Sequence, residues 1–280
     1  MPIPLILTFL LIIFLLIASI YDLKTREVPD WLPYTLIPTA FILKLLQSII
    51  TKSPNPIIYT TATFAVFWLL SLLLYHARQW GGGDAKMFMA IGAALPTYPT
   101  QLLKYLAPNL NLPFPLILII NILIAGSVYG ILYFSFIASK NNIKVKLSKK
   151  IKILTLMLIA FILALLIISP PLTKPPLLAL AVLIALFPYA TKLSRIIQTK
   201  YLTKTISLSK VTEGDWIARD IYKNKKLLIK KSIPGLALED IALLKKNNIK
   251  TITVRYGIPF VPALLLGTLL TLLIGNLFVF

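Results

Sequence analysis

The sequence contains no cysteine and only one histidine, His76. The absence of cysteine excludes disulfide bonds, thiolate zinc sites and cysteine nucleophiles. A lone histidine without an evident partner is more often a polar tip of an apolar helix than a catalytic base, and we interpret His76 in this way. The residue types therefore predict no metal and no other cofactor.

Acidic residues are also scarce, since nine Asp and Glu stand against 29 Lys and Arg, which gives a net charge of +20. Charged residues make up 14% of the chain and hydrophobic residues 58%, with a mean hydropathy of +0.86. Soluble domains carry about a quarter charged residues. The composition excludes a soluble globular protein and indicates a polytopic membrane protein.

Apolar stretches of nearly the length that crosses a hydrocarbon core recur along the chain. Seven are predicted to span, at 3–21, 33–50, 57–76, 113–139, 152–170, 176–191 and 258–280. An eighth, 87–106, contains Pro96 and Pro99, so we expect it to span only in part or to break in the middle. The first stretch lacks a basic start and a cleavage site, so we expect it to remain as a helix.

The segment after Ile197 is more polar and predicts a small domain of mixed α and β structure. Alternation predicts strands at 203–211 and 249–254, and helical spacing predicts a helix at 236–246. Its lysine clusters favour contact with anionic membrane lipids over nucleic acid, because no aromatic platform accompanies them. The predicted fold is an all-α membrane protein of about eight transmembrane helices with a small α+β cytoplasmic domain, divided into 1–196, 197–256 and 257–280.

The basic residues predict the orientation of the chain in the membrane. With the N-terminus outside and eight crossings, 25 of the 29 Lys and Arg fall on one side, which the positive-inside bias makes cytoplasmic. This topology predicts a multi-pass protein of the cell membrane. It also places Asp22 and Asp84 on the same cytoplasmic face.

Asp22 and Asp84 are two of only four acidic residues in the first 210, and both lie where apolar helices meet water. A carboxylate is costly there unless it has a function. Gly81, Gly82 and Gly83 precede Asp84 and would allow a backbone or a substrate to approach closely. Each feature alone could be an ordinary interfacial cap or loop. Together they favour a pair of carboxylates that share a proton, as in aspartic proteases.

Arg26 follows Asp22 by four positions, before Val28 and Pro29. If the first helix continues for a further turn, Arg26 lies on the same face as Asp22 and could pair with it. The residue before a proline disfavours the helical conformation, so Val28 and Pro29 should end any such helix.

These two segments resemble the signatures of the type IV prepilin peptidases, a group of membrane aspartyl proteases with a GxGD motif. Residues 213–215, 234–236 and 257–262 are similar to the archaeal branch that processes preflagellins and pilins. The resemblance implies cleavage of a class III signal peptide at the cytoplasmic face, before the hydrophobic segment of a prepilin or preflagellin. It implies Asp22 and Asp84 as catalytic residues, and Gly81–Gly83 as substrate-binding residues.

The same resemblance implies substrates with a short basic leader. Arg26, Glu27 and Asp30 flank the predicted site, and the two acids could attract such a leader. It is equally open that Glu27 and Asp30 only balance Lys24 and Arg26. Bacterial relatives also methylate the new N-terminus with a cysteine-rich segment that this sequence lacks, so only peptidase activity is expected.

Two other functions remain open from the sequence. A presenilin-like protease would cut within a helix, and Pro262-Ala263-Leu264 superficially fits that group. A transporter or assembly scaffold would also have many helices and a broken helix such as the one near Pro96, but its carboxylates should lie near the middle of the bilayer.

Overall fold

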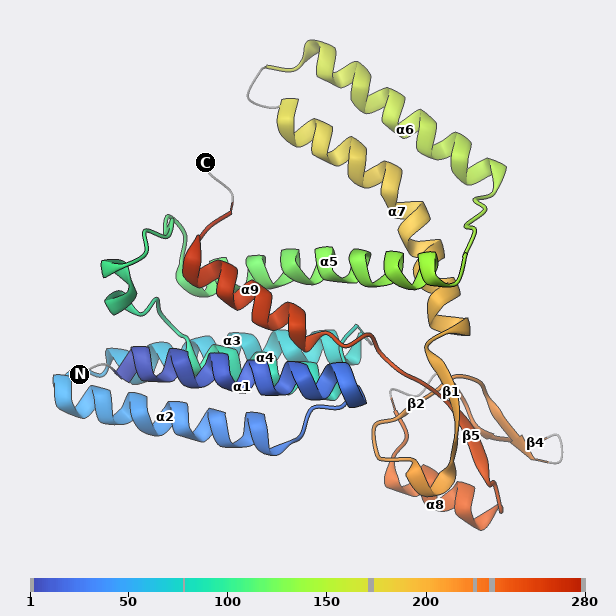
Figure 1. The fold of residues 1–280 in the computed structure, drawn as a ribbon, viewed down its shortest axis with the longest axis horizontal. Coiled ribbons are helices and arrows are strands. Elements are labelled where there is room, and N and C mark those ends of the chain that lie inside the picture. The colour runs from blue at the N-terminus through green and yellow to red at the C-terminus, as the bar shows by residue number, and fades with distance from the viewer. Residues whose placement is uncertain (1–2, 78, 171–173, 224–225, 232–234, 278–280) are drawn as a thin grey trace.

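The computed structural model describes residues 3–77, 79–170, 174–223, 226–231 and 235–277. Helices dominate it, and a small sheet region lies between the last two transmembrane candidates (Figure 1). The helices are α1 Ile3–Thr25, α2 Trp31–Thr51, α3 Asn55–His76, α4 Gly82–Ala94, α5 Phe114–Lys140, α6 Lys149–Ile168, α7 Lys174–Lys200, α8 Leu238–Lys246 and α9 Val261–Leu273.

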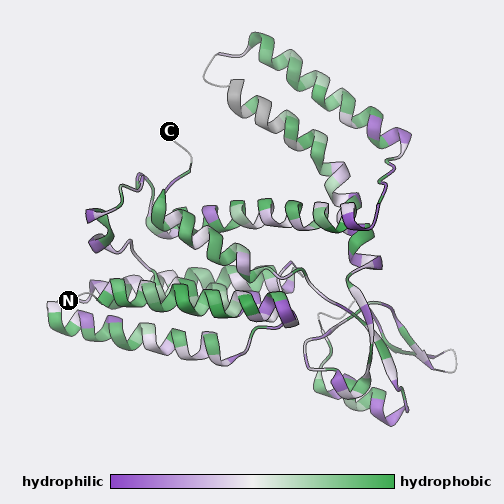
Figure 2. Cartoon of the chain, in the orientation of Figure 1, coloured by the Kyte–Doolittle hydropathy of each residue, from purple (hydrophilic) through white to green (hydrophobic). Residues whose placement is uncertain are grey.

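Five of these helices, within the described residues, are long and apolar enough to cross a membrane: α1, α2, α3, α5 and α6. They confirm five of the predicted spans and a multi-pass membrane protein. The predicted span at 176–191 falls within α7, which is not among these five helices, so its membrane crossing stays a prediction. Figure 2 shows apolar residues along the helices and hydrophilic residues mainly at their ends and over the sheet region.

Two predicted spans correspond to short helices. Segment 87–106 breaks as expected, because α4 ends at Ala94 and a 3₁₀ helix, Thr100–Lys104, follows Pro96 and Pro99. Segment 258–280 contains α9, which has 13 residues, and residues 278–280 lie outside the described part. At 1.5 Å per residue a 13-residue helix is only about 20 Å long. The count of about eight spans therefore is not established by helix length.

The first four helices, α9 and the first half of α5 form one hydrophobic core. α4 packs between α2 and α3, and α9 packs between α1 and α5. Small residues allow the closest of these contacts: a Cβ at Gly92 would lie 2.6 Å from the Phe67 side chain, and one at Gly267 would lie 2.4 Å from the Ile122 backbone. α6 and α7 form a hairpin that extends away from this core (Figure 1).

The sheet region between α7 and α9 has its own core around Leu244, Ile252 and Val254. Its antiparallel sheet has the order β1-β5-β2, with β1 Thr203–Ser207, β5 Thr251–Arg255 and β2 Trp216–Ile217. A hairpin pairs β3 Ile221–Lys223 with β4 Lys226–Ile229. The predicted α+β structure is confirmed. The strand expected at 203–211 is shorter, because a 3₁₀ turn follows at Leu208–Lys210.

Candidate active site

Asp22 lies in the last turn of α1 and its side chain is directed into the protein. The residue is 5% exposed, although Tyr21 and Leu23 on either side are exposed. Asp22 Oδ2 accepts a hydrogen bond of 2.9 Å from the main-chain N–H of Val261, the first residue of α9. A main-chain donor thus compensates part of the cost of burying this carboxyl group.

Asp84 lies in the first turn of α4 and is partly buried. Its Oδ2 accepts a hydrogen bond of 3.0 Å from the N–H of Gly81, which precedes the helix. An acidic side chain at this position commonly caps its own helix, so one role of Asp84 is local. Two features distinguish Asp84 from an ordinary helix cap: its burial, and a second acidic side chain close by.

This second acidic side chain is that of Asp22, because the end of α1 lies next to the start of α4. The negative charge of Asp22 acts on the Asp84 carboxyl group, while the N–H of Gly81 donates to it. Two neighbouring carboxyl groups cannot easily both ionise. The structure therefore brings the two predicted carboxyl groups within electrostatic reach of each other.

The start of α4 is fixed by contacts with three other elements. Val28 packs so close to Gly83 that a Cβ there would lie 2.9 Å from the Val28 side chain, and the Ser71 hydroxyl of α3 donates to the Ala85 carbonyl at 3.0 Å. Lys86 forms an ion pair of 2.6 Å with Asp30. Together these contacts hold the segment after α1 against the helix that carries Asp84.

The three glycines differ in their surroundings. Gly83 has no room for a side chain, and a Cβ at Gly81 would lie 3.3 Å from Asp84 Oδ2. A Cβ at Gly82 would meet only Tyr75, at 3.9 Å. Gly82 alone among the three thus faces open space where a substrate could approach.

The structure places Arg26 differently from the i+4 pairing considered above. α1 ends at Thr25, and Arg26 has a φ of 61°, so its backbone turns away from the helix. Arg26 forms no ion pair with Asp22 in the described part of the chain. Its guanidinium donates to the Gly257 carbonyl and to the Tyr133 hydroxyl, at 3.3 Å each.

Glu27 and Asp30 remain at the exposed surface beside the site. Asp30 pairs with Lys86, so it balances neither Lys24 nor Arg26. Glu27 has an exposed side chain, and its negative charge reaches Tyr256. Of the two acids, Glu27 is therefore the better placed to meet a cationic ligand.

Sequence reasoning did not anticipate Val261, Tyr129 or Tyr133. Val261 acts through its main-chain N–H, which does not depend on the side chain, so the residue type gives no signal. Tyr129 lies within electrostatic reach of both aspartates, and its ring stacks on Tyr133 with centroids 6.0 Å apart. The only available signal was this pair of tyrosines, four residues apart, in an otherwise apolar helix.

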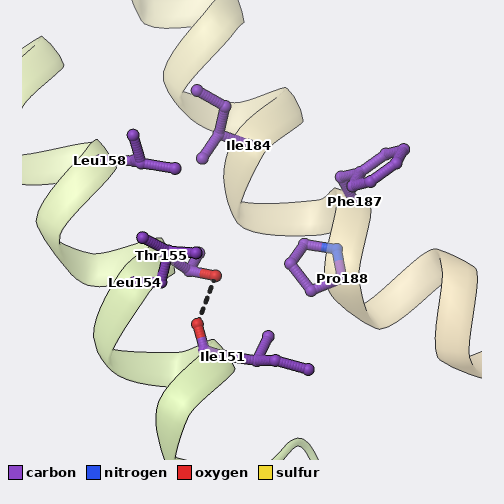
Figure 3. A pocket seen from close by; sticks show the side chains of 7 residues that line it. All are labelled: Ile151, Leu154, Thr155, Leu158, Ile184, Phe187 and Pro188. Carbon is purple, nitrogen blue, oxygen red and sulfur yellow. Dashed lines mark hydrogen bonds between the residues drawn. The ribbon is translucent and has the colours of Figure 1, made fainter.

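An apolar groove of about 330 Å³ lies elsewhere, between α6 and α7 (Figure 3). The one polar side chain at its wall, Thr155, donates its hydroxyl to the Ile151 carbonyl of its own helix. The groove contains no acid, base or nucleophile. Among the described residues, no group of three or more His, Cys, Asp and Glu is arranged to hold a metal ion.

The fold and the site define a class: a multi-pass helical membrane protein with two facing carboxyl groups at one end of its bundle. Comparison with known proteins agrees with this class. The profile of the type IV leader peptidase family matches residues 9–168, which include both aspartates, and the chain belongs to this family. The match extends beyond the first 100 residues, on which much of the resemblance depended.

Named relatives are similar over part of their length. A preflagellin peptidase of Methanocaldococcus jannaschii is 33% identical over 124 residues, which are 43% of this chain and 53% of the relative. A preflagellin peptidase of Methanococcus voltae is 31% identical over 149 residues, 52% of this chain and 62% of the relative. Prepilin peptidase EppA of Methanothermobacter thermautotrophicus is 29% identical over 143 residues, 49% of this chain and 37% of the relative. The chain thus spans about half the length of the curated relatives it matches, and no solved structure matches it.

Proposed function

We propose that this chain is a membrane-embedded aspartic endopeptidase that cleaves the class III signal peptides of prepilins or preflagellins. The observation that carries the proposal is the pair formed by Asp22 and Asp84, since two neighbouring carboxyl groups tend to share one proton and can then act as base and acid. Family membership and the names of the relatives support the substrate class.

In the proposed reaction, ionised Asp22 takes a proton from a water molecule, and the resulting hydroxide attacks the carbonyl carbon of the scissile peptide. Protonated Asp84 donates its proton to the carbonyl oxygen. The tetrahedral intermediate then collapses, its C–N bond breaks, and the nitrogen of the leaving amine takes a proton from Asp22. Asp84 recovers its proton from the oxygen as the new carboxyl group forms, so the pair returns to its starting state, with Asp22 ionised and Asp84 protonated.

The arrangement of helices supports eight crossings and a cytoplasmic site. The helices run alternately in opposite directions, and the ends of α1, α3, α5 and α7 gather at the same end of the molecule as the sheet region (Figure 1). In this proposal α4 and α9 cross with the help of their flanking segments. Residues 1–196 form the bundle with the dyad, 197–256 the basic cytoplasmic domain beside anionic lipid, and 257–280 the last crossing.

We propose that two features recognise the substrate: room for it beside Asp84, and a negative charge that attracts its basic leader. Gly82 leaves room beside Asp84, and Glu27 presents an exposed carboxylate to a basic leader. Arg26 and Asp30 contribute indirectly, because their side chains hold neighbouring segments in place. Attraction of this kind acts mainly on substrate association and weakens with added salt.

The test is co-expression of the chain with a preflagellin that carries its basic leader, followed by mass spectrometry of the product. We expect cleavage before the hydrophobic segment by the wild type and none by Asp22→Asn or Asp84→Asn, since Asn keeps the shape and removes the ionisable group. Asp220→Asn, in the cytoplasmic domain, is the matched control and should cleave normally. Continued processing by either dyad variant would refute the mechanism.

A second candidate is cleavage within the membrane segment of a substrate, as in presenilin-like proteases. The specific observation in its favour is the position of Pro262-Ala263-Leu264, which begins α9 immediately beside Asp22. The location of the scissile bond separates the two: next to the basic leader for a leader peptidase, and inside the apolar stretch for the alternative.

A further inference from the structure

The segment Tyr256–Val261, here called the strap, joins the cytoplasmic domain to the membrane bundle beside the dyad. It follows β5, the central strand of the sheet, and ends on the first residue of α9. The N–H of Tyr256 donates to the Leu202 carbonyl at 2.8 Å. This hydrogen bond fixes the first residue of the strap against the end of the domain. Five residues later it reaches Asp22.

The contact with Asp22 uses a donor that a helix leaves unsatisfied. The first N–H groups of an α-helix have no partner within the helix. The N–H of Val261 is such a group, and it donates to Asp22 Oδ2 in a buried position. The N–H of Phe260 also lies near this carboxylate. The orientation of the Asp22 carboxyl group is thus set by main-chain atoms that lie 239 positions away in the sequence.

One side of the strap is held by the chain that follows α1. Arg26 donates to the Gly257 carbonyl, and its guanidinium lies over the ring of Tyr256, 5.9 Å from the centroid. The same guanidinium donates to the Tyr133 hydroxyl on α5. Arg26 therefore connects the end of α1, the strap and α5 at one point.

The other side of the strap is held by the ring of Phe260. This ring fits against Gly126 of α5 so closely that a Cβ there would lie 2.4 Å from Phe260 Cζ. It also packs on Trp80, with ring centroids 5.3 Å apart. Trp80 is 5% exposed and directly precedes the glycines that lead to Asp84. The strap thus contacts both carboxyl-bearing segments of the dyad.

We propose that the strap is a positioning element of the active site. Through the Val261 N–H it orients the Asp22 carboxyl group toward Asp84. The contacts of Arg26, and the fit of Phe260 against Gly126, hold the strap itself in place. Its catalytic consequence rests on the proposed function, but the contact itself does not. Residues of the strap need not touch substrate for this role.

The sharpest test replaces the Val261 amide by an ester, by incorporation of the α-hydroxy acid that corresponds to valine. This change removes one N–H and leaves every side chain in place. The matched control is the same change at Ala263, whose N–H donates to the Phe260 carbonyl in the same turn of α9. We expect kcat on a preflagellin to fall by about tenfold or more for the ester at 261, because the hydrogen bond is made to a charged group, with KM nearly unchanged. Equal kcat values for the two esters would overturn the proposal.

A second test shifts the strap from the side of α5. Gly126→Ala should displace Phe260 and lower kcat about tenfold, because small displacements of reacting groups are costly. Gly130→Ala is the matched control, since a Cβ there would lie 3.9 Å from Ile258 Cδ1, an ordinary contact. Leucine lacks the outer ring atoms of phenylalanine. The double variant Gly126→Ala, Phe260→Leu should therefore have the same kcat as Phe260→Leu alone. Absence of this rescue in a normally folded double variant contradicts the strap as the cause.

A third measurement needs no substrate and so separates this inference from the proposed function. In the Asp22→Ala chain, the Val261 amide loses its acceptor, and its hydrogen exchange should speed up relative to that of Ala263 by about fivefold or more. Unchanged exchange at Val261 refutes the anchoring contact even if the chain cleaves preflagellin. Faster exchange in a chain that cleaves nothing retains the contact and rejects the peptidase.

Discussion

At the scale of single residues, the site depends on the unequal surroundings of two carboxyl groups. Asp22 is near Arg26 and accepts from the start of α9, whereas Asp84 accepts from Gly81 and has the negative charge of Asp22 as its neighbour. Two carboxyl groups in such different environments can act as base and acid at the same pH.

The closeness of the two carboxyl groups predicts a cost to stability, because a buried charge beside another of the same sign is unfavourable. Asp84→Asn removes one of the two groups that can ionise. We expect the melting temperature of this variant in detergent to exceed that of the wild type. A melting temperature equal to or below that of the wild type would show that the pair costs the fold no stability.

The residue scale also shows what the sequence could predict of the site. Asp22, Asp84 and the three glycines stand out because their types are rare in an apolar chain. The Val261 donor does not, since every residue except proline carries a main-chain N–H. The pairing of Arg26 with Asp22 required the first helix to continue past Arg26, and it does not form because the helix ends at Thr25 and Arg26 has a left-handed backbone.

At the scale of elements, the decisive contact is the one between the segment after α1 and the start of α4. Val28 and Gly83 touch there, next to Asp84, and the ion pair of Lys86 with Asp30 reinforces the contact. Because exposed ion pairs contribute little, the packing of Val28 on Gly83 should matter more than the charges.

This contact predicts a specific pattern among glycine substitutions. Gly83→Ala should lower cleavage and the melting temperature because its Cβ meets Val28 at 2.9 Å. Val28→Gly in the same chain should restore part of both, since it removes Val28 Cβ and Cγ2, the two colliding atoms. Activity assays and thermal melts of the single and double variants measure the coupling.

Gly82→Ala provides the comparison, because its Cβ meets nothing closer than 3.9 Å and alanine favours the helix. We expect its melting temperature to be unchanged or higher. If its cleavage also stays unchanged, Gly82 does not border the substrate. A Gly83→Ala chain that is as stable and active as the wild type would show that the two segments do not pack as described.

Elements were easier to predict from the sequence when they were long. The apolar runs that became α1, α2, α3, α5 and α6 were located within a few residues. α4 and α9 were harder, because short helices packed inside a bundle share the composition of spanning ones but not their length. The short strands β2, β3 and β4 were missed, since two to four residues show no measurable alternation.

At the scale of the whole molecule, the charge distribution and the alternating helices lead to one orientation. The sheet region, the connection from α5 to α6, the end of α1 and the start of α4 lie at one end of the bundle (Figure 1). Asp22 is in the last turn of α1, and Asp84 is in the first turn of α4. From the positive-inside bias we expect that end to be cytoplasmic.

This orientation predicts the labelling of single cysteines, which need no background substitutions because the chain has no cysteine of its own. Tyr105→Cys replaces a residue that is 83% exposed between α4 and α5, and a membrane-impermeant maleimide should label it in intact cells. Lys230→Cys, exposed in the cytoplasmic domain, should be labelled only after permeabilisation. The reverse pattern would invert the topology, and labelling of both in intact cells would rule out eight crossings.

The position of Val261 has a consequence for how the protein is made. Because Val261 follows Asp22 by 239 residues, a ribosome needs on the order of tens of seconds to add it after Asp22 has been synthesised. During that time α1 and α4 can already insert, and the cytoplasmic domain must be completed before α9 emerges. The Asp22 carboxyl group therefore cannot accept the Val261 hydrogen bond until nearly the whole chain has been synthesised. In the proposed peptidase the pair of aspartates is completed last, and an unfinished chain in the translocon lacks the contact that we propose orients Asp22.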